Sequence, residues 1–122
     1  MTAPERGQTG GPVREIQDAD GTTLVKLHGD IDLYCSPEVR KALLEATQSR
    51  PATLAIDLSK VPHMDSSGVA TLVEALQRVK RYKGRMALVA MQERVRNVFE
   101  IARLTDLFEI RDTLAEVQSR GG

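Results

Sequence analysis

The sequence predicts an α/β domain in which an antiparallel N-terminal hairpin precedes parallel strands of one mixed central sheet, packed by amphipathic helices. Two apolar runs, 54–58 and 86–90, show little alternation of polar and apolar residues, as expected for central strands in a sheet that helices bury. Helix-like segments separate these runs, and parallel strands require such crossover connections, which are almost always right-handed. With 122 residues, the chain is long enough for a core without disulfides or bound metal.

The expected domain spans residues 13–118. Residues 1–12 are rich in Gly and Pro and carry almost no side chain that a core could bury, so a disordered tail is expected there. Residues 119–122 form the expected C-terminal tail. Their Arg-Gly-Gly end resembles ubiquitin-like conjugation tails, but nothing else in the sequence supports that interpretation.

The N-terminal part predicts a hairpin, a loop and a helix. Strands are expected at 13–16 and 23–27, joined by the turn residues 18–21, because Gly21 can adopt a positive φ at little cost. A loop with two alternating carboxylates follows at 28–34. Ser36-Pro37-Glu38 then predicts a helix start, with the Ser36 hydroxyl as N-cap and proline at the first helical position. This helix should end near Ser49.

The C-terminal part predicts three more helical segments. The first runs from Val69 to about Tyr82, because its apolar residues repeat at intervals of three and four, and Gly84 should stop it. A second helix should turn Val95, Val98, Phe99 and Ala102 inward. A short apolar run at 107–110 and a last amphipathic segment around Leu114 and Val117 complete the domain.

Charge and composition argue against several classes of partner. Lys plus Arg number 17 and Asp plus Glu number 17, so the chain has no basic field that would favour nucleic acid or an anionic membrane. Two Phe, two Tyr and no Trp leave few platforms on which bases could stack. The expected partner is therefore a protein or a small molecule, with no direct binding of nucleic acid.

A single cysteine, Cys35, excludes an intramolecular disulfide and a cysteine-based zinc site, and it is interpreted as a small, at least half-buried side chain. No metal or cofactor is expected. No apolar run is long enough to span a bilayer, and the N-terminus lacks the hydrophobic stretch of a signal peptide. The expected location is the cytoplasm.

The most informative stretch is His63-Met64-Asp65-Ser66-Ser67-Gly68, between the apolar run 53–58 and the helix that follows. Hydroxyls placed there lie beside the unpaired backbone N–H groups of a helix N-terminus, where negative charge is favourable. The two serines can be helix caps, a nucleophile or a modification switch. The residues alone leave the cap and the functional serine equally open, and Ser67 is the better cap.

The nucleophile interpretation is a serine hydrolase that uses Ser66, with His63 or His28 as base. The Gly-x-Ser-x-Gly nucleophile elbow is absent, and His63 is too near in sequence to approach Ser66 freely. We therefore expect that the protein is not an enzyme. Both histidines, and Met64, are interpreted as surface or structural residues.

Two stretches carry a resemblance to a known family. Residues 29–37, Gly-Asp-Ile-Asp-Leu-Tyr-Cys-Ser-Pro, are similar to a Gly-acid-apolar-Asp loop that leads into a first helix. Residues 56–69 are similar to a strand followed by Asp-Ser-Ser/Thr-Gly-apolar. In this order and spacing the chain resembles the STAS-domain anti-sigma factor antagonists from about residue 13 to residue 117. One departure is Val69-Ala70, where Leu-Gly is commoner.

The resemblance implies a single STAS-like domain and a partner switch. Such proteins bind an anti-sigma factor that is also a serine kinase and thereby release a sigma factor; phosphorylation ends the association, and a PP2C-type phosphatase reverses it. Carried over to this sequence, Ser66 would be the phosphoacceptor. The partner-binding residues would be Asp30, Asp32, Asp65, Ser66, Ser67 and Gly68. A STAS subunit of a membrane transporter or of a regulatory scaffold is the alternative that shares the fold.

Overall fold

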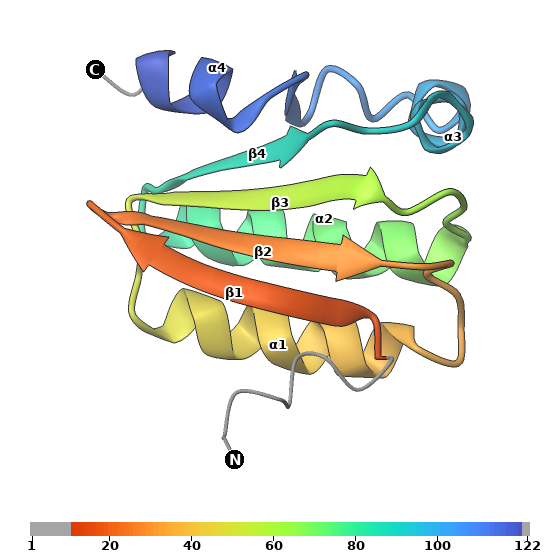
Figure 1. Cartoon of the computed structure of the whole chain (residues 1–122), viewed down its shortest axis with the longest axis horizontal. Helices are drawn as coiled ribbons and strands as arrows, with labels where there is room; N and C mark the ends of the chain where they lie inside the picture. The colour runs from red at the N-terminus through yellow and green to blue at the C-terminus, as the bar shows by residue number, and fades with distance from the viewer. Residues whose placement is uncertain (1–10, 121–122) are drawn as a thin grey trace.

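Five strands form one sheet in the order β1-β2-β3-β4-β5 in the computed structural model, which describes residues 11–120 (Figure 1). The strands are β1 (Val13–Ala19), β2 (Thr22–His28), β3 (Thr53–Lys60), β4 (Arg85–Val89) and β5 (Glu109–Arg111). The helices are α1 (Ser36–Gln48), α2 (Ser66–Arg81), α3 (Glu93–Ile101) and α4 (Leu114–Arg120). Most of the expected N-terminal tail, and residues 121–122 of the C-terminal one, lie outside the described residues.

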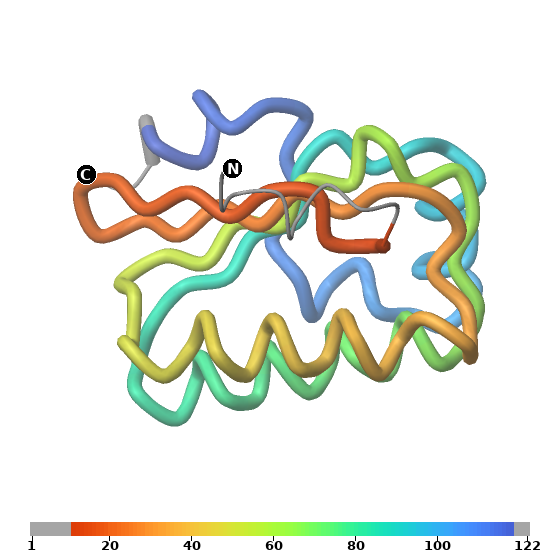
Figure 2. The backbone as a smooth tube through the Cα atoms, turned by 60° about the horizontal axis from the view of Figure 1, so that its bottom comes forward, coloured from red at the N-terminus to blue at the C-terminus, as the bar shows by residue number. Residues whose placement is uncertain are grey.

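The sheet is mixed, as the sequence predicts. Strand β1 pairs antiparallel with β2, and each neighbouring pair from β2 to β5 is parallel. Helices α1 and α2 lie side by side against one face and run in the same direction, so both end at the same end of the molecule (Figure 2). Their N-termini therefore lie together at the carboxyl ends of the parallel strands β2 and β3.

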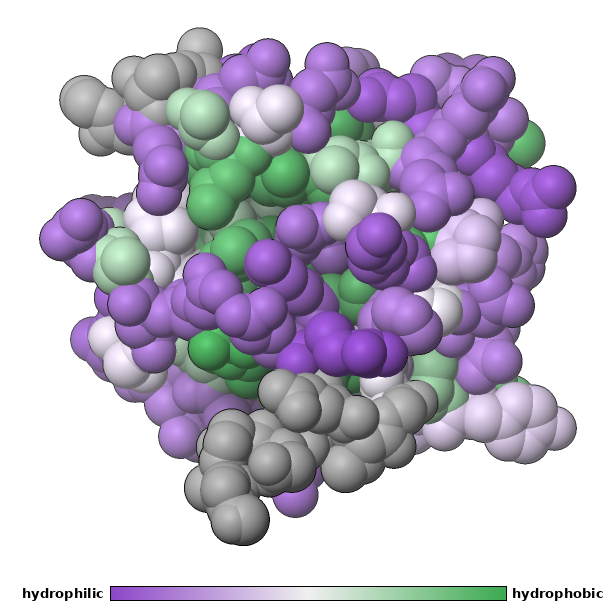
Figure 3. Space-filling model, in the orientation of Figure 1, coloured by the Kyte–Doolittle hydropathy of each residue, from purple (hydrophilic) through white to green (hydrophobic). Residues whose placement is uncertain are grey.

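Two cores lie on the two faces of the sheet. The larger core joins alternate residues of β2, β3 and β4 with the inner sides of α1, α2 and α3, and its fully buried Phe99 packs edge to face on Phe108. The smaller core lies under α4 and consists of Leu24, Ala55, Ala87, Val89 and Val117. Apolar surface shows between α4 and the strands, and polar side chains dominate the rest of that view (Figure 3).

The hairpin turn is tighter than the sequence pattern indicates. Strand β1 continues to Ala19, which pairs with Thr22, so the turn consists of Asp20 and Gly21 alone. Both residues have positive φ, 54° and 82°, as a two-residue turn that matches the twist of the strands requires. The prediction of a four-residue turn at 18–21 is therefore wrong at Asp18 and Ala19.

Helix α2 ends at Arg81 with Tyr82 as its C-cap, as predicted, but it begins at Ser66, three residues before the predicted Val69. The backbone N–H of Lys83 donates to Lys80 O and that of Gly84 donates to Val79 O, which is the hydrogen-bond pattern of a Schellman motif. In this motif Lys83, with a φ of 65°, occupies the left-handed position that glycine usually fills. Glycine at position 84 instead avoids a steric clash with the Tyr82 ring, because a Cβ there would lie 2.5 Å from Cε1 of Tyr82.

Lys83→Gly should stabilise the protein by about 0.5 kcal/mol. Removing the left-handed strain of a non-glycine residue gains about 1 kcal/mol, and the greater backbone entropy of glycine in the unfolded chain offsets part of it. Lys41→Gly, at an exposed position inside α1, is the matched control and should cost about 1 kcal/mol. Urea denaturation of both variants measures the difference, and destabilisation by Lys83→Gly would contradict the strain assigned here.

Candidate functional site

Two loops meet at the carboxyl ends of β2 and β3, where sites form in open sheets of this kind. Ile31, after β2, and Met64, after β3, form an isolated parallel bridge. The Ile31 N–H donates to His63 O at 3.0 Å, and the Asp65 N–H donates to Ile31 O at 3.1 Å. Because Ile31 and Met64 are each 1% exposed, the bridge is anchored in the core and fixes the start of α2 against the loop at 29–35.

Asp65, and not Ser67, caps helix α2. Its extended backbone leads into the helix, and its Oδ1 accepts hydrogen bonds from the N–H groups of Ser67 at 2.9 Å and Gly68 at 3.2 Å. The prediction that Ser67 is the cap is wrong: the Ser67 hydroxyl donates to Asp65 Oδ1 at 2.6 Å. Aspartate caps as well as serine does, and its charge also suits the helix N-terminus.

The same carboxylate connects the two loops, because Asp65 Oδ2 accepts from the Leu33 N–H at 3.1 Å. Together these hydrogen bonds lower the pKa of Asp65, and the largest contribution comes from the Ser67 hydroxyl. A carboxyl with a lowered pKa in the folded state stabilises the fold above its unfolded pKa. That stabilisation is lost as the pH falls through the folded pKa.

Ser67→Ala should raise the pKa of Asp65 towards its ordinary value and cost about 1 kcal/mol of stability at neutral pH. The loss should shrink as the pH falls, because the charge that the hydroxyl stabilises is then neutralised. Carboxyl ¹³C shifts followed against pH report the pKa directly. Ser59→Ala, which removes an exposed hydroxyl elsewhere, is the control. An unchanged Asp65 pKa in Ser67→Ala would refute the assignment.

Ser66 is the first residue of α2 and is exposed. Within residues 11–120 its hydroxyl makes no hydrogen bond, to a histidine or to any other group, so the base that a serine hydrolase requires is not in place there. His63 and His28 are both exposed, whereas Met64 belongs to the core. Ser66 thus presents a free hydroxyl at the positive end of a helix.

The other predicted partner-binding residues differ in how accessible they are. Asp30 is exposed, Asp32, Asp65 and Ser67 are half-buried, and Gly68 is buried. A Cβ at Gly68 would lie 2.6 Å from Met64 Cγ, 2.9 Å from Ile31 Cγ2 and 3.0 Å from Ile31 O. Glycine is therefore what allows the first turn of α2 to pack against the bridge.

Asp32 organises the entry to α1. Its Oδ1 accepts from the N–H groups of Tyr34 at 3.0 Å and Cys35 at 3.2 Å. Cys35 occupies the N-cap position without a side-chain cap, so the prediction that Ser36 is the N-cap is wrong, and Ser36 is the first helical residue.

The thiol of Cys35 is part of the same turn. It accepts from the Asp32 N–H and donates to Asp30 O, at 3.4 and 3.3 Å. Burial raises the pKa of this thiol, which favours its uncharged form. This half-buried, hydrogen-bonded thiol matches the structural role expected from the sequence.

Leu33 and Tyr34 are exposed on the loop at 29–35, and the sequence interpretation did not single them out. Tyr34 is 92% exposed and Leu33 is 67% exposed. The Leu33 backbone is hydrogen-bonded to Asp65, the residue before Ser66, so this apolar pair and the free hydroxyl share one rigid platform. An aliphatic and an aromatic residue directly after the two loop carboxylates, in a chain with four aromatics, are the signal that could have indicated them.

The described part of the chain holds neither a membrane-spanning helix nor a candidate metal cluster. None of its helices is both long and apolar enough to cross a membrane. Its His, Cys, Asp and Glu side chains form no group of three or more that could hold a metal ion.

Comparisons with known proteins agree with this arrangement. The chain is similar to the anti-sigma-B factor antagonist of Listeria monocytogenes, with 31% identity over 104 residues that cover 84% of this chain and 91% of that protein. The antagonist of the same name from Bacillus subtilis is 30% identical over 108 residues, which cover 88% and 94%. An anti-sigma factor antagonist from Mycobacterium paratuberculosis superimposes with a TM-score of 0.80 at 25% identity, over 87% of this chain and 90% of that chain.

The family assignment rests on nearly the whole described domain. The family model described as STAS domain matches residues 13–117, from the first strand to within α4. The fold and the related antagonists agree with this match, and these relatives are regulatory binding proteins and not enzymes. The chain therefore belongs to the STAS domain family.

Proposed function

We propose that this protein binds an anti-sigma factor that is also a serine kinase, that binding releases a sigma factor, and that phosphorylation of Ser66 ends the association. The similarity to anti-sigma-B factor antagonists supports the general role. The observation that carries the switch is the exposed Ser66 hydroxyl, free of hydrogen bonds within residues 11–120, at the N-terminus of α2. A PP2C-type phosphatase would restore the active form, and the cytoplasm is the proposed location.

A phosphate at Ser66 should leave the domain folded. Phosphoserine carries about −1.5 to −2 charges at neutral pH, and a helix N-terminus stabilises negative charge by about 0.3–1 kcal/mol. The nearby carboxylate of Asp65 opposes this gain, but it is held by its own hydrogen bonds to the backbone. The effect of phosphorylation therefore falls on the partner, which meets a more acidic surface.

The proposed contact surface consists of Asp30, Leu33, Tyr34 and Ser66. Its apolar part is Leu33 and Tyr34, and exposed aromatic residues are the commonest anchors of protein interfaces. Asp32, Asp65, Ser67 and Gly68 would act mainly by holding these residues in place, because each is at least half-buried in the loop junction.

Tyr34→Ala should weaken binding to the anti-sigma factor about tenfold, or about 1.4 kcal/mol. Stability should change little, because the side chain is 92% exposed. Isothermal titration calorimetry measures the affinity, and Ile16→Ala, which truncates a 47% exposed side chain on the edge strand β1, is the control. Equal affinity of Tyr34→Ala and the wild type would remove Tyr34 from the contact surface.

Affinity capture from the native cell extract tests the function as a whole. The expected captured protein is an ATP-binding protein related to histidine kinases, and Ser66→Asp should fail to capture it. If the wild type and Ser66→Asp instead capture permease and ATPase subunits equally, the protein is a transporter subunit, and the proposal is contradicted.

A further inference from the structure

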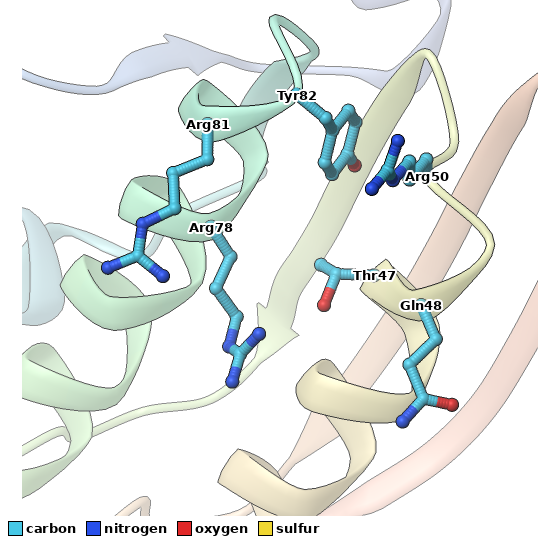
Figure 4. A pocket seen from close by; sticks show the side chains of 6 residues that line it. All are labelled: Thr47, Gln48, Arg50, Arg78, Arg81 and Tyr82. Atoms are coloured by element: carbon cyan, nitrogen blue, oxygen red, sulfur yellow. The ribbon is translucent and has the colours of Figure 1, made fainter.

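A hollow of about 340 Å³ lies at the opposite end of the helix pair from Ser66, where α1 and α2 end (Figure 4). Its lining consists of Thr47, Gln48, Arg50, Arg78, Arg81 and Tyr82. Helix α2 is sixteen residues long, which separates this end from Ser66 by about 24 Å. A volume of this size is within the range of small-molecule pockets, at its lower end.

The hollow carries surplus positive charge. Among the described residues, Arg50 and Arg81 form no ion pair. Arg78 interacts electrostatically with Glu74, but both oxygens of that carboxylate already accept hydrogen bonds from Arg40, at 2.7 and 2.8 Å. The C-termini of two helices contribute about half a negative charge each, so three guanidinium groups leave a surplus of about two positive charges.

Two buried polar atoms in this lining lack a partner. In the described part of the chain, neither Nε of Arg78 nor the phenol oxygen of Tyr82 makes a hydrogen bond, although both atoms are buried. Buried polar atoms are nearly always hydrogen-bonded in native proteins. Burial raises the pKa of Tyr82, so the phenol keeps its proton and can act as a donor. Both atoms therefore lack an acceptor, and an anion supplies acceptors.

We propose that this hollow binds a phosphate group, either as free phosphate or as the monoester of a small molecule. Arg50, Arg78 and Tyr82 would hold it, whereas Arg81, whose side chain extends away from α1 in Figure 4, would lie at the rim. Guanidinium groups pair with phosphate through parallel hydrogen bonds, and a doubly charged group matches the surplus charge. This site is separate from the Ser66 switch and does not depend on it.

An NMR titration of the full chain tests the proposal at constant ionic strength. The ligands are inorganic phosphate, ribose 5-phosphate and ribose, with sodium chloride as the salt control. Backbone amides at 47–50 and 78–84 should shift with the phosphate-bearing ligands, and ribose should have no effect. If ribose 5-phosphate binds more tightly than inorganic phosphate, the site takes a phosphorylated small molecule. If the two bind equally, the site takes free phosphate. Both results support a phosphate site.

Variants distinguish a specific binding site from general electrostatic attraction of anions. Arg78→Gln and Arg50→Gln should each weaken phosphate binding about tenfold, the loss expected for a charge-assisted pair, and Tyr82→Phe should weaken it about threefold. Arg94→Gln removes the same charge from the exposed side of α3 and should change nothing. Shifts centred on residues 66–68, shifts reproduced by chloride, or equal losses in Arg94→Gln and Arg78→Gln would overturn the proposal.

Discussion

On the proposed switch, Ser66→Asp should lower the affinity for the anti-sigma factor by a factor on the order of 100, or about 2.7 kcal/mol, while the domain should stay folded. Turning a complex from mostly formed to mostly broken takes about 5.5 kcal/mol, and an exposed charge pair contributes about 1 kcal/mol or less. Repulsion at the rim of an interface is therefore too small. The proposed switch therefore requires Ser66 to lie inside the contact surface, where a carboxylate, and still more a phosphate, would lose its hydration.

Calorimetry with three variants measures this effect. Ser66→Ala should bind as tightly as the wild type, because the free hydroxyl makes no bond that the fold needs. Ser49→Asp, which adds the same charge at the exposed end of α1, should also bind normally. Unchanged binding by Ser66→Asp, or an equal loss in Ser49→Asp, would exclude Ser66 from the contact surface.

Gly68→Ala should destabilise the protein by about 2 kcal/mol and should weaken the proposed partner binding. The added methyl group would lie 2.6 Å from Met64 Cγ and 3.0 Å from the backbone oxygen of Ile31. Both neighbours are 1% exposed, so neither can move aside into solvent, and overpacking of this kind costs about 1–3 kcal/mol. The higher helix propensity of alanine offsets only part of that destabilisation.

Urea denaturation measures this loss, with Ser66→Ala as control because it places alanine in the same helical turn at an exposed position. Amide shifts in the loop at 29–35 should accompany the Gly68→Ala change, since Ile31 connects that loop to α2. The helix propensity of alanine alone would make Gly68→Ala more stable than the wild type. Such a gain would contradict the close packing of α2 against Ile31 and Met64.

The sheet could be predicted from sequence because its signals are local. The apolar runs of β3, interrupted only by Asp57, and of β4 indicate burial from neighbouring residues, as does the three-and-four repeat of α2. The functional edge of the sheet follows from the order of the strands. Ser66 was indicated in the same way, by its place between a strand and a helix.

One contact that the sequence did not indicate joins distant segments, whereas the other errors concern hydrogen bonds within a few residues. Asp65 is the cap of α2 and also bonds the Leu33 N–H, 32 residues earlier, and no local pattern shows that the loop passes there. The local differences are that Asp32 organises the entry to α1 in place of Ser36, and that Lys83, next to the predicted stop Gly84, takes the left-handed position. The exposure of Leu33 and Tyr34 depends on the same loop path.

The most direct test of the partner switch is a phosphorylation assay with the captured anti-sigma factor and ATP, read by mass spectrometry and by release of the complex. The protein should gain one phosphate, at Ser66, and should then dissociate, whereas Ser66→Ala should gain none and stay bound. Phosphate found only at another residue such as Ser67, or a Ser66-phosphorylated protein that binds as tightly as before, would contradict the account.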